Sequence, residues 1–131
     1  MFLFDPIIKS LQNVGGISTY FDELMKFCRK NSIEHIVLPL AIKNSEKPHM
    51  LNLLQRSLER YRSCAVERHL ALIDKATFLS SYYRLPSTPI PSAVTVHDFV
   101  YEKYMTGFSR LVHTRQKYSS IRAAKKIICI S

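Results

Sequence analysis

Long hydrophobic stretches are missing from this sequence of 131 residues. A membrane-spanning helix needs about 20 consecutive apolar residues. The longest apolar run, HIVLPLAI (35–42), has only the length of a strand and contains Pro39. The N-terminal residues MFLFDP also lack the basic start and long apolar stretch of a secretory signal. These absences predict a cytoplasmic protein.

Glycine is scarce as well, with three residues, while 47% of the chain is hydrophobic. This composition is typical of a globular chain and excludes a disordered one. The length fits a single domain spanning residues 1–131.

Cysteines are few and widely separated. Cys28, Cys64 and Cys129 form no CxxC pair, and none of the five histidines lies at ligand spacing from a cysteine. An odd number of scattered cysteines indicates reduced, buried thiols. We therefore expect neither disulfides nor a bound metal.

Acidic residues are outnumbered, 10 against 19 basic ones, which gives a net charge of +9. Between residues 108 and 126 there is no acid at all, and the basic residues there are Arg110, Arg115, Lys117, Arg122, Lys125 and Lys126. Such a segment is either a solvated helix face or a contact for an anionic surface. The lack of acids favours a peripheral contact with an anionic membrane, where each basic residue contributes about 1 kcal/mol. No recognition motif accompanies the charge, which argues against nucleic acid.

Short apolar segments alternate with segments of helical periodicity. The predicted strands are 2–4, 35–40, 76–81, 93–98 and 126–130, and the predicted helices are 17–30, 50–73 and a segment around 111–121. Residues 7–16, 43–48 and 82–92 are predicted loops, and 99–107 is irregular. Continuously apolar strands fit a mostly parallel sheet with helices on both faces, which is a Rossmann-like α/β fold. Ligands of such sheets bind beyond the carboxyl ends of the strands.

Two adjacent glycines, Gly15 and Gly16, precede the first predicted helix. They are either a plain turn or a place where a phosphate or sugar approaches the free amides of the helix. The dinucleotide-binding pattern G-x-G-x-x-G is absent.

Polar groups follow two other predicted strands. His97 and Asp98 end VTVHD, where a histidine can exchange a proton with a substrate hydroxyl and the aspartate can orient it or cap the next segment. The segment LSSYYRLP (79–86) offers Ser80, Tyr82 and Arg84, either to line a sugar site or to pack against the core. Ser131 follows the last strand and belongs to the same predicted edge.

Four stretches taken in order resemble one family of enzymes. LQNVGGISTYFDEL, FLSSYYRLP, VTVHDFVYEKY and RAAKKIICIS are similar to segments in the N-terminal domain of retaining GT-B glycosyltransferases of family 4, a group rich in mannosyltransferases of bacterial surface polysaccharides. The matches span nearly the whole chain.

The resemblance implies a role for each matched position. Gly15 and Gly16 would face the donor diphosphate and the acceptor, Tyr20 would bind substrate, and His97 would lie near the transferred sugar. Ser80, Tyr82, Asp98 and Ser131 would line or support the same cleft. The implied substrates are a nucleotide sugar and a glycan or polyprenyl-linked acceptor. The resemblance implies that the enzyme needs no cofactor and no metal.

The sequence departs from the family in two ways. Leu79 stands where many relatives carry histidine, which puts an acceptor contact there in doubt. The donor-binding C-terminal domain, with its E-x7-E carboxylates, has no counterpart within these residues. The resemblance therefore implies an inactive half of an enzyme: a fragment, a truncated reading frame or one member of a split pair. It also implies a location at the inner face of the cytoplasmic membrane.

Overall fold

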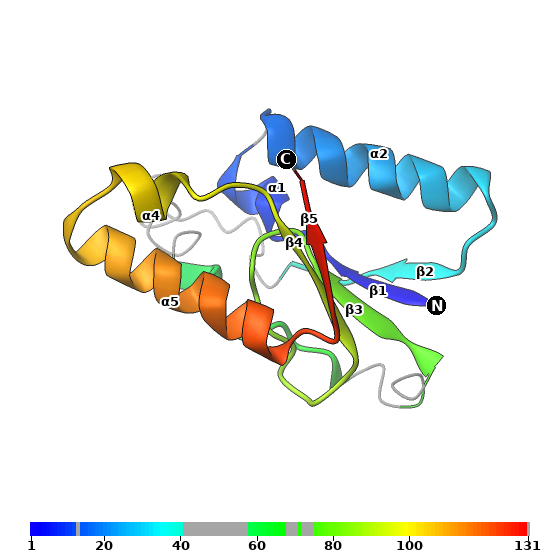
Figure 1. The fold of residues 1–131 in the computed structure, drawn as a ribbon. Helices are drawn as coiled ribbons and strands as arrows, with labels where there is room; N and C mark the ends of the chain where they lie inside the picture. The colour runs from blue at the N-terminus through cyan, green and yellow to red at the C-terminus, as the bar shows by residue number, and fades with distance from the viewer. Residues whose placement is uncertain (13, 41–57, 68–70, 72–74, 131) are drawn as a thin grey trace, which may run out of the picture.

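A computed structural model describes residues 1–12, 14–40, 58–67, 71 and 75–130. In chain order the described elements are β1 (Phe2–Asp5), α1 (Ile8–Leu11), α2 (Gly16–Lys30), β2 (His35–Val37), β3 (Thr77–Ser80), β4 (Ser92–Val96), α4 (Val100–Tyr104), α5 (Gly107–Ala123) and β5 (Lys126–Cys129). Figure 1 shows the strands between α2 on one side and α4 with α5 on the other.

The five strands form one sheet in the order β2-β1-β3-β4-β5, and every neighbouring pair is parallel. The predicted α/β fold with a parallel sheet is thereby confirmed. Pro6 follows β1 directly, and a proline cannot donate a backbone hydrogen bond to a neighbouring strand. The carboxyl ends of all five strands meet at one edge of the sheet, as the sequence predicts.

Each face of the sheet has its own core because side chains alternate along a strand. Phe4 and Leu79 pack with Phe21 and Met25 of α2 on one face. On the other face, Phe78 packs with Leu3, and this core also includes Leu38, Cys64, Val66, Ala76 and Ile90. Helix α2 therefore follows the ordinary rule that a helix buries its apolar stripe.

Two predicted loops contain short helices. Residues 7–16 include α1, and residues 99–107 include α4 and the start of α5. Gly107 begins α5 with φ of 73°, a conformation that favours glycine. A single helical turn leaves little periodicity in the sequence, which explains why neither α1 nor α4 was predicted.

The predicted helix 50–73 lies partly outside the described residues; within the described part, Leu58 and Glu59 are helical, and residues 60–66 are not. Cys64 instead pairs with the proline-containing loop: its backbone N–H donates to Leu85 O (2.7 Å), and its carbonyl accepts from Ser87 N (2.8 Å). The expectation of buried thiols is correct for Cys28 and Cys64 and wrong for Cys129, which is exposed because β5 is the edge strand of the described sheet.

Candidate functional site

A cavity of about 140 Å³ lies at the carboxyl edge of the sheet. It is formed by the start of α2, by the segments that follow β3 and β4, and by α4 and α5. Its lining residues are Ile17, Tyr82, Tyr83, His97, Asp98, Val100, Tyr101 and His113. Small-molecule pockets usually enclose about 300–1,000 Å³, so the cavity has the size of part of a binding site.

The glycine pair lies beside this cavity, at the beginning of α2. Gly15 is the N-cap residue of α2, and no side chain among the described residues caps the first amides of this helix. A Cβ on Gly15 would lie 2.8 Å from the flexible amide of Gln12, whereas a Cβ on Gly16 would meet nothing within 4 Å. No contact within the described chain thus requires glycine at position 16, and the space beside it is open to a ligand.

His97 lies directly after β4, half-buried between two elements of the site. Its ring meets that of Tyr20 edge to face at 5.5 Å, and its backbone N–H donates to the Tyr83 hydroxyl at 3.3 Å. Burial lowers the pKa of His97, partly offset by the carboxylate of Asp98. The imidazole is therefore mostly neutral at pH 7 and able to accept a hydrogen bond or a proton.

Asp98 supports the segment after β4. Its carboxylate accepts from the N–H of Val100 at 3.1 Å, two residues further on, at the start of α4. Its carbonyl accepts from Nζ of Lys117 in α5. Of the two roles that the sequence left open for Asp98, these contacts agree with capping the next segment.

His113, in α5, lines the cavity and was missed by the sequence analysis. It is 2% exposed, its Nε2 lies 2.9 Å from the Tyr82 hydroxyl, and Tyr101 stacks on its ring at 3.9 Å. Burial, followed by the charges of Lys117 and Arg60, lowers the pKa of His113 to about 4. A neutral imidazole thus holds the Tyr82 hydroxyl at the cavity wall, and burial raises the pKa of that hydroxyl above its usual value.

Lys117 joins α5 to the segment after β4. Its side chain is fully buried, and its Nζ lies 2.9 Å from the Glu102 carboxylate and 4.8 Å from the centre of the Phe99 ring. A buried ammonium is tolerated only when it is paired in this way. One turn further along α5, Ser120 donates to the carbonyl of Tyr83.

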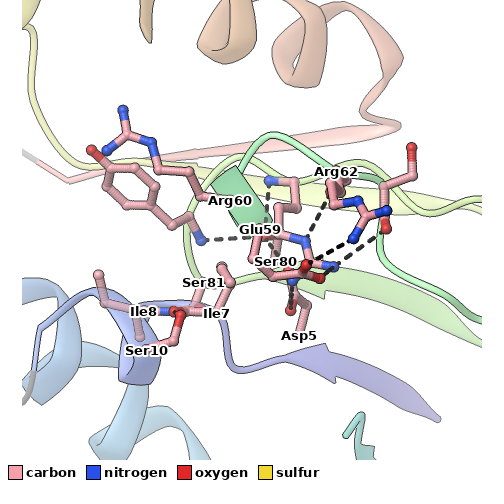
Figure 2. Close-up of polar contacts among 12 residues, drawn as sticks. Asp5, Ile7, Ile8, Ser10, Glu59, Arg60, Arg62, Ser80 and Ser81 are labelled. Atoms are coloured by element: carbon pink, nitrogen blue, oxygen red, sulfur yellow. Dashed lines mark hydrogen bonds and ion pairs between the residues drawn. The ribbon is translucent and has the colours of Figure 1, made fainter. Parts of the chain in front are cut away.

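Below the cavity, a buried ion-pair network fixes the loop after β3. Arg84 lies 3.6 Å from Asp5 and 3.4 Å from Glu59, and all three side chains are buried. Ser80 donates to Asp5 at 3.0 Å and accepts from the backbone N–H groups of Tyr82 and Arg84 (Figure 2). The hydroxyl of Ser80 and the guanidinium of Arg84 are therefore occupied within the protein, and they hold Tyr82 in place.

Among the predicted site residues, the structure brings Tyr20, Tyr82, His97 and Asp98 together beside the glycines. Ser80 lies beneath them in the ion-pair network, and Ser131 lies outside the described residues. The helical spacing of His113, Lys117 and Ser120 predicts that they share one side of a helix, but it does not identify Tyr82 as the partner of His113.

Within the described ranges, no three histidine, cysteine or acidic side chains gather to hold a metal ion. In the same part of the chain, no helix is long and apolar enough to cross a membrane. No protein-family model matches the chain, and no curated protein or solved structure matches it. The fold and the site define an α/β protein with an all-parallel sheet and a small cavity at its carboxyl edge.

Proposed function

We propose that this chain is the acceptor-binding half of a retaining glycosyltransferase, working with a second, donor-binding domain. The substrates are a nucleotide sugar and a glycan or polyprenyl-linked acceptor. The chain takes no metal in this role. The proposal rests on the resemblance of four ordered sequence segments and on the chemistry available at the carboxyl edge of the sheet.

The observation that carries the proposal is the convergence of the helix start and the two histidines. The open space beside Gly16 and the uncapped first turn of α2 suit a phosphate or a sugar hydroxyl. Neutral His97 and the hydroxyl of Tyr82 offer hydrogen bonds to a sugar across a cavity of about 140 Å³. A cavity of this size accommodates part of a substrate, which agrees with a site completed by another domain.

The exposed strand β5 supports the second domain independently. Ile127 and Ile128 point to opposite faces of the sheet, and both are exposed. An apolar edge strand of this kind is normally covered. In the proposed enzyme, the donor-binding domain would cover this strand.

A transfer assay tests the proposal. The chain alone is expected to move no sugar from GDP-mannose or UDP-glucose to a polyprenyl-linked acceptor, and transfer is expected once a donor-binding domain is joined to it. Sugar transfer by the chain alone would contradict the proposal that it needs a separate donor-binding domain. Failure in the joined protein with every nucleotide sugar would contradict the function itself.

His97→Ala sharpens this assay. In the joined enzyme we expect the substitution to lower turnover by about 10²-fold or more, the scale of a lost general acid–base contact. The free energy of unfolding should change by less than about 1 kcal/mol, because the half-buried ring packs edge to face with Tyr20 alone among the aromatic rings of the described chain. Val14→Ala, at an exposed position before the glycines, is the control. Unchanged turnover in His97→Ala would remove this residue from the mechanism.

A second candidate function is a non-catalytic module that binds an anionic surface. The charge of +9 and the acid-free segment 108–126 favour it. Under this function, removal of His97 would leave surface binding unchanged.

A further inference from the structure

A second pocket lies where α5 meets the segments 61–63 and 83–85. It encloses about 260 Å³, and Tyr83 is the one lining residue that it shares with the candidate cavity. No acidic residue is among its lining residues. We call it the arginine pocket because it is lined by Arg62, Arg84 and Arg115.

Hydrogen bonds join the walls of the arginine pocket to one another. The guanidinium of the buried Arg84 donates to the carbonyls of Arg62 at 3.1 Å and Ser63 at 3.3 Å. The side-chain amide of Gln116, in α5, donates to the carbonyl of Arg60. The pocket is therefore already formed without a ligand, which lowers the entropic cost of binding one.

The charges of the arginine pocket leave an excess of positive charge. Arg84 is paired with the buried Asp5 and Glu59. Arg62 lies 3.7 Å from Glu59, and its side chain is 76% exposed, so this second pairing contributes little. Arg115 is exposed and forms no ion pair with the described part of the chain. Three arginines thus face two carboxylates, and the pocket attracts an anion.

Tyr83, the wall shared with the candidate cavity, has an unusual backbone conformation. Its φ is 54°, a value that residues other than glycine seldom adopt. Its carbonyl accepts from the Ser120 hydroxyl, and its own hydroxyl accepts from the N–H of His97. Strained residues of this kind gather at ligand sites. These contacts hold Tyr83 as a partition between the two pockets.

We infer that the arginine pocket binds the phosphate group of a small phosphorylated molecule, with Arg62 and Arg115 contacting the phosphate oxygens. Planar guanidinium groups bind phosphate through paired hydrogen bonds. A phosphate ester carries a charge of about −1.5 to −2 at pH 7, which matches two arginines. Leu85 and Val112 supply apolar contact for the group that carries the phosphate. The inference goes beyond the proposed function and does not depend on sugar transfer.

Shape and charge favour this ligand over others. Small-molecule sites usually enclose about 300–1,000 Å³, so a pocket of about 260 Å³ suits a small ligand. A carboxylate carries a single charge and would leave one of the two arginines without a partner. Nucleic acid would track basic residues along a groove and stack its bases on aromatic rings, and it would not need an enclosed pocket.

Nuclear magnetic resonance of the isotope-labelled full chain, titrated with glucose 1-phosphate, tests the inference. We expect saturable shifts at the amides of Ser63 and Ser119, which line the pocket. Glucose, which has the same ring without the phosphate, should leave both amides unshifted.

Two single variants identify the arginines that bind. Arg62→Gln and Arg115→Gln should each weaken the binding of glucose 1-phosphate by about tenfold, the scale of one lost hydrogen bond to a charged group. Both side chains are exposed, and circular dichroism checks that each variant is folded. Arg29→Gln with Arg110→Gln is the control: it removes two exposed charges outside the pocket and should leave binding unchanged.

Several outcomes would overturn the inference. Shifts confined to Gly16 and His97 would assign the phosphate to the candidate cavity. An equal loss of binding in the control would show that only net charge matters. Equal binding of glucose, or no saturable shift at Ser63 and Ser119, would exclude a phosphate site. Binding of an oligonucleotide without binding of glucose 1-phosphate would assign the arginines to nucleic acid.

Discussion

The two longest helices in the described part of the chain bury opposite kinds of side chain. Helix α2 turns Phe21, Met25 and Cys28 to the sheet and keeps its charges in solvent. Helix α5 buries His113 and Lys117, together with Ser120, and leaves its apolar residues exposed. Helix α2 has an amphipathic sequence and buries its apolar side, whereas the apolar residues of α5 do not gather on one side of the helix.

The difference follows from what each helix packs against. The face of the sheet under α2 is apolar, with Phe4 and Leu79 at its centre. Helix α5 instead meets the loops after β3 and β4, whose carbonyls, hydroxyls and Glu102 carboxylate need partners once they are buried. Hydrogen bonds therefore set the rotation of α5, and the same bonds build one wall of the cavity.

The largest expected effect is a difference in the free energy of unfolding between substitutions of apolar residues in the two helices. Phe21→Ala should lower the free energy of unfolding by about 3–5 kcal/mol because it empties a buried position. Leu111→Ala, at an exposed position of α5, should change it by less than about 0.5 kcal/mol. Urea unfolding followed by circular dichroism measures both. A loss of several kcal/mol in Leu111→Ala would mean that Leu111 is buried in the folded protein.

The second-largest expected effect is a pH dependence of stability that comes from His113 in α5. The pKa of His113 is about 4 when folded and about 6.5 when unfolded, so its contribution to stability is present above pH 6.5 and is lost as the pH falls toward 4. The loss approaches about 3 kcal/mol at pH 4. The measurement is the free energy of unfolding between pH 7 and pH 4.

Two variants in which position 113 does not titrate between pH 7 and pH 4 test whether His113 causes this pH dependence. His113→Phe keeps an aromatic ring, and His113→Gln keeps a polar side chain. Both should be less stable at pH 7 and should show a flatter pH dependence. A wild-type slope in both variants would place the titration elsewhere.

The smallest effect concerns a single hydroxyl. Ser120→Ala removes the donor to the buried carbonyl of Tyr83 and should cost about 1–3 kcal/mol. The neighbouring Ser119 is exposed, and Ser119→Ala should be neutral within about 0.5 kcal/mol. Equal stability of the two variants would argue against hydrogen bonding as the reason for the rotation of α5.

The sequence predicts the parallel sheet well because its strands are continuous apolar runs, and local composition is enough to locate them. Short-range patterns also place Gly16 and His97 after strands, at the edge where the cavity lies. The roles of Ser80 and His113 could not be predicted. Their partners, Asp5 and Tyr82, lie 75 and 31 residues away in the chain, so no local pattern reports them.

The central claim is that the cavity between the start of α2 and the polar face of α5 binds a sugar. Nuclear magnetic resonance of the isotope-labelled chain, titrated with methyl α-mannoside and with a short polyprenyl-diphosphate glycan, tests it most directly. We expect saturable shifts at the Gly16 amide and the His97 ring, a smaller shift at His113 and none at Phe27 on the far part of α2. Shifts confined to other regions, or no saturable shift with either ligand, would contradict the claim.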